Sequence, residues 1–217
     1  DLHATPPLRG AAPEAGGILE RVPDLLAIQW HITTASYHIK RIQEIESMEH
    51  MEYWDIYDRD KRPTGRTMKR NDWCLGEGEY HLTVLGVLAR PDGRFLITKR
   101  VMTKAWAPGC WEVPGGAAMA GEDSLTAVKR EIREETGLDV TGWEGGCLFT
   151  YQRENPGEGD NYFVDVYRFV SDFSLEDVRI QEAEADGSRL ADAGEIRELA
   201  ERGIFLHYDS IKKAFEM

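Results

Sequence analysis

The stretch GAAMAGEDSLTAVKREIREETGL, residues 116–138, decides the fold that we expect for this chain. It predicts a helix over 123–136, because Asp123 or Ser124 can cap the first turn and Gly137 can end the last turn in the left-handed conformation. Apolar residues recur at the spacing i, i+3 and i+7, which places them in one stripe along the helix: Leu125, Val128 and Ile132. We therefore expect this helix to pack its apolar stripe against a β-sheet.

Three glutamates, Glu131, Glu134 and Glu135, stand at i, i+3 and i+4 of the same helix and share one of its faces. Such like charges repel one another unless a cation lies among them, although a glutamate-rich helix face can also be a plain solvated surface. Carboxylate oxygens without histidine or cysteine are ligands for Mg²⁺ or Mn²⁺ rather than for zinc. The pattern favours a Mg²⁺ site, with Mn²⁺ as the alternative. Arg130 is placed to brace Glu122 or a neighbouring carboxylate through a bidentate ion pair.

The segment WEVPGG, residues 111–116, offers a glycine-rich turn just before this helix. Without a Cβ atom, its backbone can approach a metal ion or a phosphate closely. Hard cations beside a loop that admits phosphate indicate chemistry on a diphosphate. Further upstream, Lys99, Arg100 and Lys104 either hold a substrate phosphate or are ordinary surface charges.

The rest of the chain reads as a mixed α/β domain behind an N-terminal extension. Two apolar runs, 81–89 and 95–98, flank a Pro-Asp-Gly sequence whose proline presets φ and whose glycine supplies a positive φ, so we expect a β-hairpin. The other elements that we expect are a second strand pair, 147–152 with 162–170, joined by the loop 155–160, and helices over 195–202 and 208–217. We expect residues 1–47 to be partly disordered, with one short helix.

Composition limits the class of protein. With 217 residues, of which 41% are hydrophobic and 30% charged, the chain is long enough for one domain with a real core plus a remainder. No apolar run approaches the ~20 residues of a spanning helix, and the first twenty residues hold no apolar stretch like that of a signal peptide. The net charge of −13 disfavours a nucleic-acid polymer or an anionic membrane as a partner.

Cysteine usage indicates a reducing compartment. Cys74, Cys110 and Cys147 are odd in number and lie outside any CxxC pattern, so we expect neither a disulfide framework nor a structural zinc site. We therefore expect a soluble, cytoplasmic protein. The oligomeric state stays open, with a homodimer as one option.

The spacing within residues 116–138 matches the Nudix box, Gly-x5-Glu-x7-Arg-Glu-U-x-Glu-Glu-x-Gly-U with U aliphatic, at every specified position. The chain thus resembles the Nudix hydrolase family over residues 51–205. Its aromatic opening from Tyr53 to Asp58, together with Tyr80-His81, is similar to the branch close to isopentenyl-diphosphate isomerase. The resemblance implies an α/β protein with the Nudix fold, in which a mixed β-sheet is sandwiched between helices, as a single catalytic domain over 48–217.

The resemblance also implies roles for individual residues. By matched position, the catalytic residues are Glu122, Arg130, Glu131, Glu134 and Glu135, of which the last three bind the metal together with the backbone carbonyl of Gly115. Family members hydrolyse a nucleoside or other organic diphosphate, and water activated by the metals or by a carboxylate attacks phosphorus in line. The general base stays open between a box glutamate and one of five loop carboxylates: Glu154, Glu158, Asp160, Glu182 and Glu184.

Aromatic residues surround the expected site. Tyr151 and Tyr162 border the loop 155–160 and either line the substrate pocket or pack in the core. We expect Trp106 and Trp111 to belong to the core or to a wall of the site rather than to a platform on which a base stacks.

Two other functions remain open beside a Mg²⁺-dependent hydrolase of a small diphosphate. The first is isopentenyl-diphosphate isomerisation, but those isomerases use a cysteine just after the tryptophan of the glycine-rich approach, whereas Cys110 here precedes Trp111. They also lack the full glutamate array that this chain keeps. The second is a non-catalytic, nucleotide-sensing Nudix module, which the loss of box carboxylates would favour, and none is lost. The identity of the substrate lies in loops outside the box.

Overall fold

The computed structural model describes residues 52–155 and 157–216 of the chain. These residues belong to one unit of the fold, which spans 51–217. The predicted extension over 1–47, with its short helix, lies outside the described residues.

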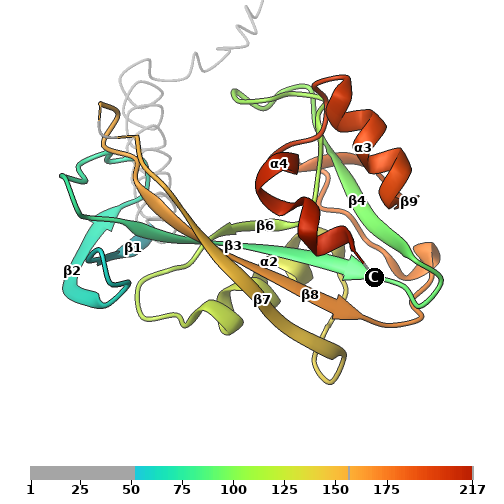
Figure 1. Cartoon of the computed structure of the whole chain (residues 1–217), viewed down its shortest axis with the longest axis horizontal. Coiled ribbons are helices and arrows are strands. Elements are labelled where there is room, and N and C mark those ends of the chain that lie inside the picture. The colour runs from blue at the N-terminus through green and yellow to red at the C-terminus, as the bar shows by residue number, and fades with distance from the viewer. Residues whose placement is uncertain (1–51, 156, 217) are drawn as a thin grey trace, which may run out of the picture. The chain divides into compact units, whose positions relative to one another are not determined.

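Seven strands form one mixed sheet: β3 (His81–Ala89), β4 (Arg94–Arg100), β5 (Trp111–Glu112), β6 (Gly115–Ala117), β7 (Glu144–Arg153), β8 (Tyr162–Val170) and β9 (Ala185–Asp192). At its centre, β3 pairs in parallel with β8 and antiparallel with β6 (Figure 1). Strand β8 also pairs antiparallel with β7, which confirms the second predicted strand pair and extends it beyond 147–152. The remaining strands, β5 and β9, pair antiparallel with β4.

The predicted hairpin is confirmed at its turn but not along its arms. Strands β3 and β4 pair only where Ala89 lies opposite Phe95, and Gly93 in the turn has a φ of +83°. Beyond this point β3 continues against β6 and β8, while β4 turns away to run with β9 and β5 (Figure 1). We call this divergence the fork. The segment 111–117 bridges it, because its first residues pair with β4 as β5 and its last residues pair with β3 as β6.

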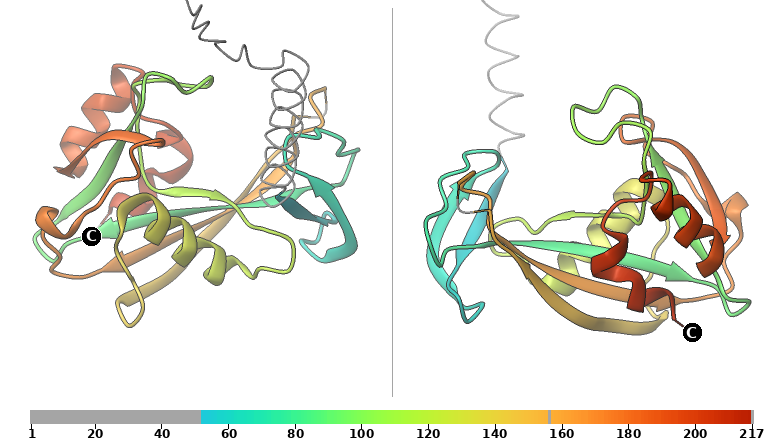
Figure 2. Two further views of the ribbon diagram at one scale, coloured as in Figure 1. Left: turned by 180° about the vertical axis from the view of Figure 1, so that it is seen from behind. Right: turned by 45° about the horizontal axis from the view of Figure 1, so that its top comes forward.

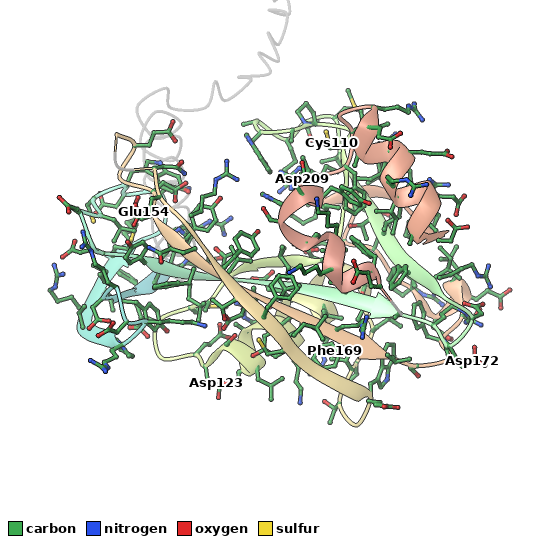
Figure 3. All side chains as sticks on the ribbon, viewed as in Figure 1. Cys110, Asp123, Glu154, Phe169, Asp172 and Asp209 are labelled. Atoms are coloured by element: carbon green, nitrogen blue, oxygen red, sulfur yellow. The ribbon has the colours of Figure 1, made fainter. Side chains whose placement is uncertain are left out.

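Helix α2 (Ser124–Thr136) has the ends that its sequence predicts. The Asp123 side chain accepts a hydrogen bond from the backbone N–H of Thr126 at 2.7 Å. At the other end Gly137 has a φ of +72° and donates its N–H to the carbonyl of Arg133 at 2.9 Å. Asp123 begins the helix at the lower edge of the view in Figure 3.

The apolar stripe of α2 differs from the prediction at one residue. Val128 and Ile132 are fully buried, but Leu125 is 42% exposed. Gly86 of β3 explains the closeness of the helix to the sheet, because a Cβ atom there would lie 2.6 Å from Cδ1 of Ile132. The buried face is therefore centred on the residues over Gly86, and Leu125 in the first turn lies to one side of it.

Helices cover both faces of the sheet, as predicted. Helix α2 lies on one face, and α3 (Ala193–Glu201), α4 (Tyr208–Ile211) and the 3₁₀ turn η2 (Lys212–Phe215) pack against the other (Figure 2). A further 3₁₀ turn, η1 (Leu175–Asp177), follows β8. The prediction of a helix over 195–202 is confirmed within two residues, and the C-terminal helix is shorter than predicted because a 3₁₀ turn replaces its second half. No helix within 52–216 is long and apolar enough to cross a membrane.

A separate two-stranded sheet, β1 (Tyr53–Tyr57) and β2 (Pro63–Lys69), was not predicted. It docks on the loop before α2, where the carbonyl of Tyr53 accepts from the N–H of Ala120 and the Asp55 carboxylate accepts from the N–H of Gly121, both at 2.7 Å. Trp54 is buried in a small core of its own with Ile56, Met68 and Leu75. The hairpin thereby becomes one wall beside residues 116–121.

Candidate active site

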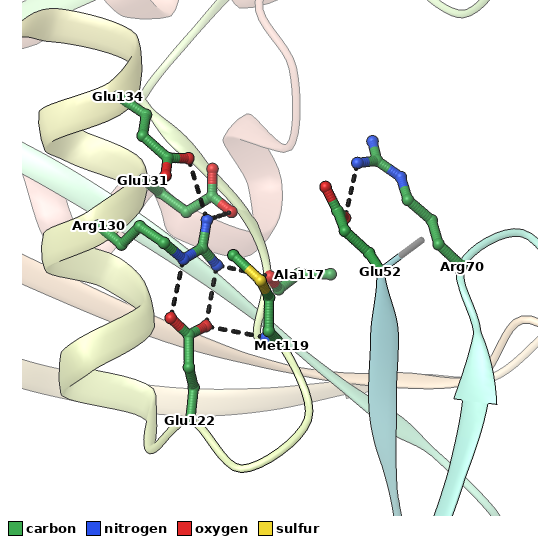
Figure 4. A network of polar contacts seen from close by, with 8 residues as sticks. All are labelled: Glu52, Arg70, Ala117, Met119, Glu122, Arg130, Glu131 and Glu134. Atoms are coloured by element: carbon green, nitrogen blue, oxygen red, sulfur yellow. Dashed lines mark hydrogen bonds and ion pairs between the residues drawn. The ribbon is translucent and has the colours of Figure 1, made fainter. Parts of the chain in front are cut away.

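Arg130 is the centre of a polar network at the start of the box (Figure 4). Its Nε and Nη2 donate to the two carboxylate oxygens of Glu122 at 2.8 and 2.9 Å, which confirms the predicted bidentate pair. Nη2 also donates to the carbonyl of Ala117 at 3.2 Å, and Glu122 accepts from the N–H of Met119 at 2.9 Å. The guanidinium thus ties α2 to the loop 117–122.

The same guanidinium holds two of the three box glutamates. Nη1 of Arg130 donates to Glu131 at 2.8 Å and to Glu134 at 3.1 Å. The Glu131 side chain is 14% exposed, whereas that of Glu134 is 52% exposed. Burial raises the pKa of the Glu131 carboxyl, although Arg130 opposes the shift.

Glu135, the third box glutamate, lies near β5 and β6. Burial raises the pKa of its carboxyl well above the ordinary value, and the carboxylates of Glu131, Glu112 and Glu184 add to the shift. The backbone N–H of Gly115 donates a hydrogen bond to Glu135 and opposes it. Carboxylates from α2, β5 and the loop before β9 therefore lie near enough to Glu135 for their charges to raise its pKa.

Two basic residues offset part of this charge. Arg100 Nη1 lies 3.0 and 3.2 Å from the two carboxylate oxygens of Glu112, and Lys104 forms an ion pair with Glu184. The sequence left open whether these two residues hold a substrate phosphate or are surface charges, and the structure pairs them with Glu112 and Glu184. Lys99 lies further out, 3.9 Å from Asp186.

The donor set around Glu135 fits a hard divalent cation. All its side-chain donors are carboxylate oxygens, which suit Mg²⁺ or Mn²⁺. A Cβ atom at Gly116 would lie 2.6 Å from Oε1 of Glu131, so the absence of a side chain there creates the space that the carboxylate occupies. Within 52–155 and 157–216 no three acidic, histidine or cysteine side chains converge on one point, because Arg130 draws Glu131 and Glu134 to itself.

The five candidates for the general base are now separated in space. Only Glu184 is close enough to Glu135 to affect the pKa of its carboxyl. Glu154 instead accepts a hydrogen bond from the Tyr80 hydroxyl just after the end of β7, and Figure 3 shows it on a different part of the fold from Cys110, the residue before β5. Asp160 faces His81 at 3.1 Å, and Glu158 borders the same space as Asp160. Glu182 lies in a separate surface hollow with Arg179 and Asp186.

A cleft of about 610 Å³ begins at Gly116 and Ala117 and runs between the β1–β2 hairpin and the ends of β7 and β8. Tyr151 and Tyr162 both line it, and burial raises the pKa of Tyr151 to about 12. Trp106 also lines it and is 58% exposed, so it forms a wall and not part of the core.

Several residues of this cleft were missed at the level of sequence, notably Trp54, Trp73, His81, Arg153 and His207. The period of two along β3 could have indicated one of them, because His81 shares a strand face with Thr83 and Leu85, which also line the cleft. His207 has a φ of +59°, unusual outside glycine, and its ring stacks on Trp106 with centroids 5.8 Å apart. Its position depends on the packing of the C-terminal segment, which has no local sequence signal.

Replacing Arg130 by lysine should lower kcat/KM by roughly 10- to 100-fold, the usual effect of losing a residue that orients metal ligands. A lysine keeps the charge but cannot bridge Glu122, Glu131 and the Ala117 carbonyl at once. A metal titration of activity should show a higher Mg²⁺ requirement. The matched control is Arg133→Lys, since Arg133 pairs with Asp139 at the surface, and equal losses in both variants would contradict the role of the Arg130 network.

Comparison with known proteins agrees with the geometry. Residues 79–212 match the model of the NUDIX domain family. The uncharacterized Nudix hydrolase lmo0368 of Listeria monocytogenes is 31% identical over 166 residues, which cover 75% of this chain and 93% of that protein. The nucleoside triphosphatase NudI of Salmonella heidelberg is 38% identical over 66 residues, 28% of this chain and 47% of that protein. The crystal structure of DR0079 from Deinococcus radiodurans shares the fold with a TM-score of 0.56 at 22% identity, covering 69% of this chain and 90% of that one. The family model and the Listeria relative together show that this chain belongs to the Nudix hydrolase family.

Proposed function

We propose that this chain hydrolyses the diphosphate bond of a nucleoside-diphosphate-type or other organic diphosphate with the help of Mg²⁺ or Mn²⁺. The observation that carries the proposal is the group of carboxylates around Glu135: Glu112, Glu131 and Glu184 raise the pKa of its half-buried carboxyl, which accepts from the N–H of Gly115 next to the cleft residue Gly116. Buried carboxylates repel one another and are costly to ionise unless a cation joins them. The glycine-rich backbone beside them leaves room for phosphate.

In this proposal Glu131, Glu134 and Glu135 hold the cations, with the Gly115 carbonyl as a further ligand. Bound cations would neutralise the diphosphate and polarise its phosphorus. Arg130 and Glu122 position Glu131 through the hydrogen bonds of their network.

Glu184 is our choice for the general base, because it alone among the five candidates lies near Glu135. The water oxygen forms a bond to one phosphorus, the bond from that phosphorus to the bridging oxygen breaks, and Glu184 accepts the proton. The bridging oxygen leaves with the other phosphate. The products are a monophosphate and a second phosphate-bearing compound.

Arg100 and Lys104 would bind the substrate once cations are present. In this structure they neutralise Glu112 and Glu184. Cations at the cluster would reduce that demand and leave the two basic side chains to donate to phosphate oxygens. Tyr151 would contact the remainder of the substrate from the cleft wall.

The net charge of the chain and its division into an extension and a domain bear on the partner and the location that we propose. A net charge of −13 supports a small-molecule substrate over a nucleic-acid polymer or a membrane surface. We propose a cytoplasmic enzyme with the catalytic domain over 48–217 and residues 1–47 as an extension, and a homodimer stays an option. NudI is named as a nucleoside triphosphatase, which supports nucleotides as the first substrates to test.

The test is ³¹P NMR of the protein with Mg²⁺ and a panel of nucleoside diphosphates, nucleoside triphosphates, a nucleotide sugar and isopentenyl diphosphate. We expect new phosphate signals from at least one compound, absent without metal and absent in Glu135→Gln. Cleavage that persists in the variant would contradict the proposed site. Proton spectra of the isopentenyl sample would reveal isomerisation, and isomerisation without hydrolysis of any compound would overturn the proposal.

A further inference from the structure

Two buried rings that lie face to face belong to the lining of the cleft. Trp54 of β1 and His81 of β3 are each 5% exposed, and their rings stack with centroids 4.5 Å apart at an interplanar angle of 25°. Both residues line the cleft that begins at Gly116 and Ala117. The stacked pair therefore lies where the part of a substrate beyond its diphosphate would extend.

Asp160 defines the hydrogen-bonding role of His81. Nε2 of His81 lies 3.1 Å from Oδ1 of Asp160. Because an ionised carboxylate only accepts hydrogen bonds, this nitrogen carries the hydrogen in the neutral imidazole, and Nδ1 is left as an acceptor. The indole Nε1 of Trp54 can only donate. With the imidazole in its neutral form, the two rings offer one donor and one acceptor.

Neither of these nitrogens has a hydrogen-bond partner among the described residues. Nε1 of Trp54 and Nδ1 of His81 are both shielded from solvent and unpaired. Unpaired buried polar atoms are rare and costly, and one common reason for them is a ligand that completes the bonds. Two such atoms on stacked rings, both in residues that line one cleft, indicate a single ligand group.

We propose that Trp54 and His81 recognise the polar edge of a planar ring attached to the diphosphate, as in a nucleobase. This inference rests on the proposed function and narrows its substrate to the nucleoside type. A nucleobase presents a donor and an acceptor side by side on its edge, which complements an indole N–H and an imidazole acceptor. A hydrocarbon group such as an isopentenyl chain would leave both nitrogens unpaired, so the same pair discriminates against it.

Trp73 lies beside the stacked pair at the border of the cleft. Its ring meets Trp54 edge to face with centroids 6.4 Å apart, yet it is 46% exposed at the border of the cleft. Because the two nitrogens are covered in this structure, a ligand reaches them by displacing a neighbouring side chain. Trp73 is the exposed member of the group, and its indole offers a face on which the incoming ring can stack.

The test compares substrates that differ only in the base. With Mg²⁺ present, kcat/KM is measured for CDP, UDP, ADP and GDP, for ribose 5-diphosphate, which lacks a base, and for isopentenyl diphosphate. We expect the best nucleoside diphosphate to exceed ribose 5-diphosphate by at least about tenfold, and Trp54→Phe to lower that ratio by about tenfold. The matched control is Trp143→Phe, because Trp143 stacks on Phe173 in another part of the fold and should leave the ratio unchanged.

The outcomes separate this inference from the proposed function. Glu135-dependent cleavage of every compound at similar kcat/KM would overturn the inference and leave the hydrolase intact, as would preference for isopentenyl diphosphate. No Glu135-dependent cleavage at all would count against the proposed function itself. The comparison of substrates on the unaltered protein decides the question even where Trp54→Phe fails to fold.

Discussion

Glutamine in place of Glu135 should lower kcat by roughly a thousandfold and, at the same time, raise the melting temperature of the metal-free protein. The loss follows from removing the charge of a proposed metal ligand, since ~4 kcal/mol of transition-state stabilisation corresponds to about three powers of ten. The gain follows from burial. The Glu135 carboxylate lies among Glu131, Glu112 and Glu184, so an uncharged amide of nearly the same volume relieves their repulsion.

The pH dependence of this stabilisation has a definite sign. Because the pKa of Glu135 is raised in the folded state, its stabilising contribution is complete below the unfolded pKa of about 4.3 and is lost as pH rises through the folded value. The glutamine does not titrate. The advantage of Glu135→Gln in melting temperature should therefore be small at pH 4 and larger at pH 8.

Differential scanning fluorimetry with EDTA or with Mg²⁺ checks both parts. Metal should raise the melting temperature of the unaltered protein more than that of Glu135→Gln, because ligands that bind only the folded state stabilise it. Glu144→Gln on the exposed start of β7 is the control and should change neither activity nor the metal response. A lower melting temperature of Glu135→Gln at pH 8 would contradict this explanation, because it would mean that the carboxylate stabilises the fold despite the neighbouring negative charges.

Alanine at Gly116 should mainly lower activity, whereas alanine at the adjacent Gly115 should mainly lower the stability of the fold. At Gly116 the new Cβ would lie 2.6 Å from Oε1 of Glu131, the end of a flexible side chain that can move aside. At Gly115 the new Cβ would lie 2.2 Å from the backbone carbonyl of Val84, which is held in the sheet. We expect Gly116→Ala to keep its fold and lose activity about 100-fold, because a ligand displaced by ~1 Å costs about that much.

Gly115→Ala should instead lower the free energy of unfolding by about 2–4 kcal/mol, the scale of strain in a packed core. Urea denaturation followed by tryptophan fluorescence measures this for both variants, and a phosphate-release assay measures activity. Gly146→Ala, at a glycine whose Cβ would meet no atom within 4 Å, is the control for the loss of glycine itself. Normal activity in Gly116→Ala would show that the position of the Glu131 carboxylate does not matter for the reaction.

Local sequence predicted the parts of the site that lie on one element. Three of these features depend only on residues within 122–137: the cap of α2, its end at Gly137, and the pairing of Arg130 with Glu122. Over so short a segment, side-chain directions follow from helix geometry. The expectation for Leu125 was wrong because the rotation of a helix on a sheet depends on the partner surface. Here that surface is set by Gly86, about forty residues away.

Contacts between distant segments could not be predicted in the same way. Glu112 and Glu184 meet Glu135 only because β5 and the loop before β9 both lie along β4. The association of Trp54 with His81 depends on a hairpin of its own that docks on the loop before α2. Neither arrangement leaves a periodic pattern, since each depends on tertiary packing, which the single sequence does not display.

The fork has a geometric consequence for the turn at its apex. Strand β4 has seven residues, so at about 3.3 Å each its far end lies about 23 Å from the turn. A rotation of about 3° at the apex would shift that end by ~1 Å, and a shift of this size can change a rate by about 100-fold. Asp92 braces the apex by accepting from Arg90 at 3.2 Å and from Arg94 at 2.7 Å. Because β5 pairs with β4, the same arm carries both Arg100 and Glu112, so the angle held at the turn determines how far this ion pair lies from β3.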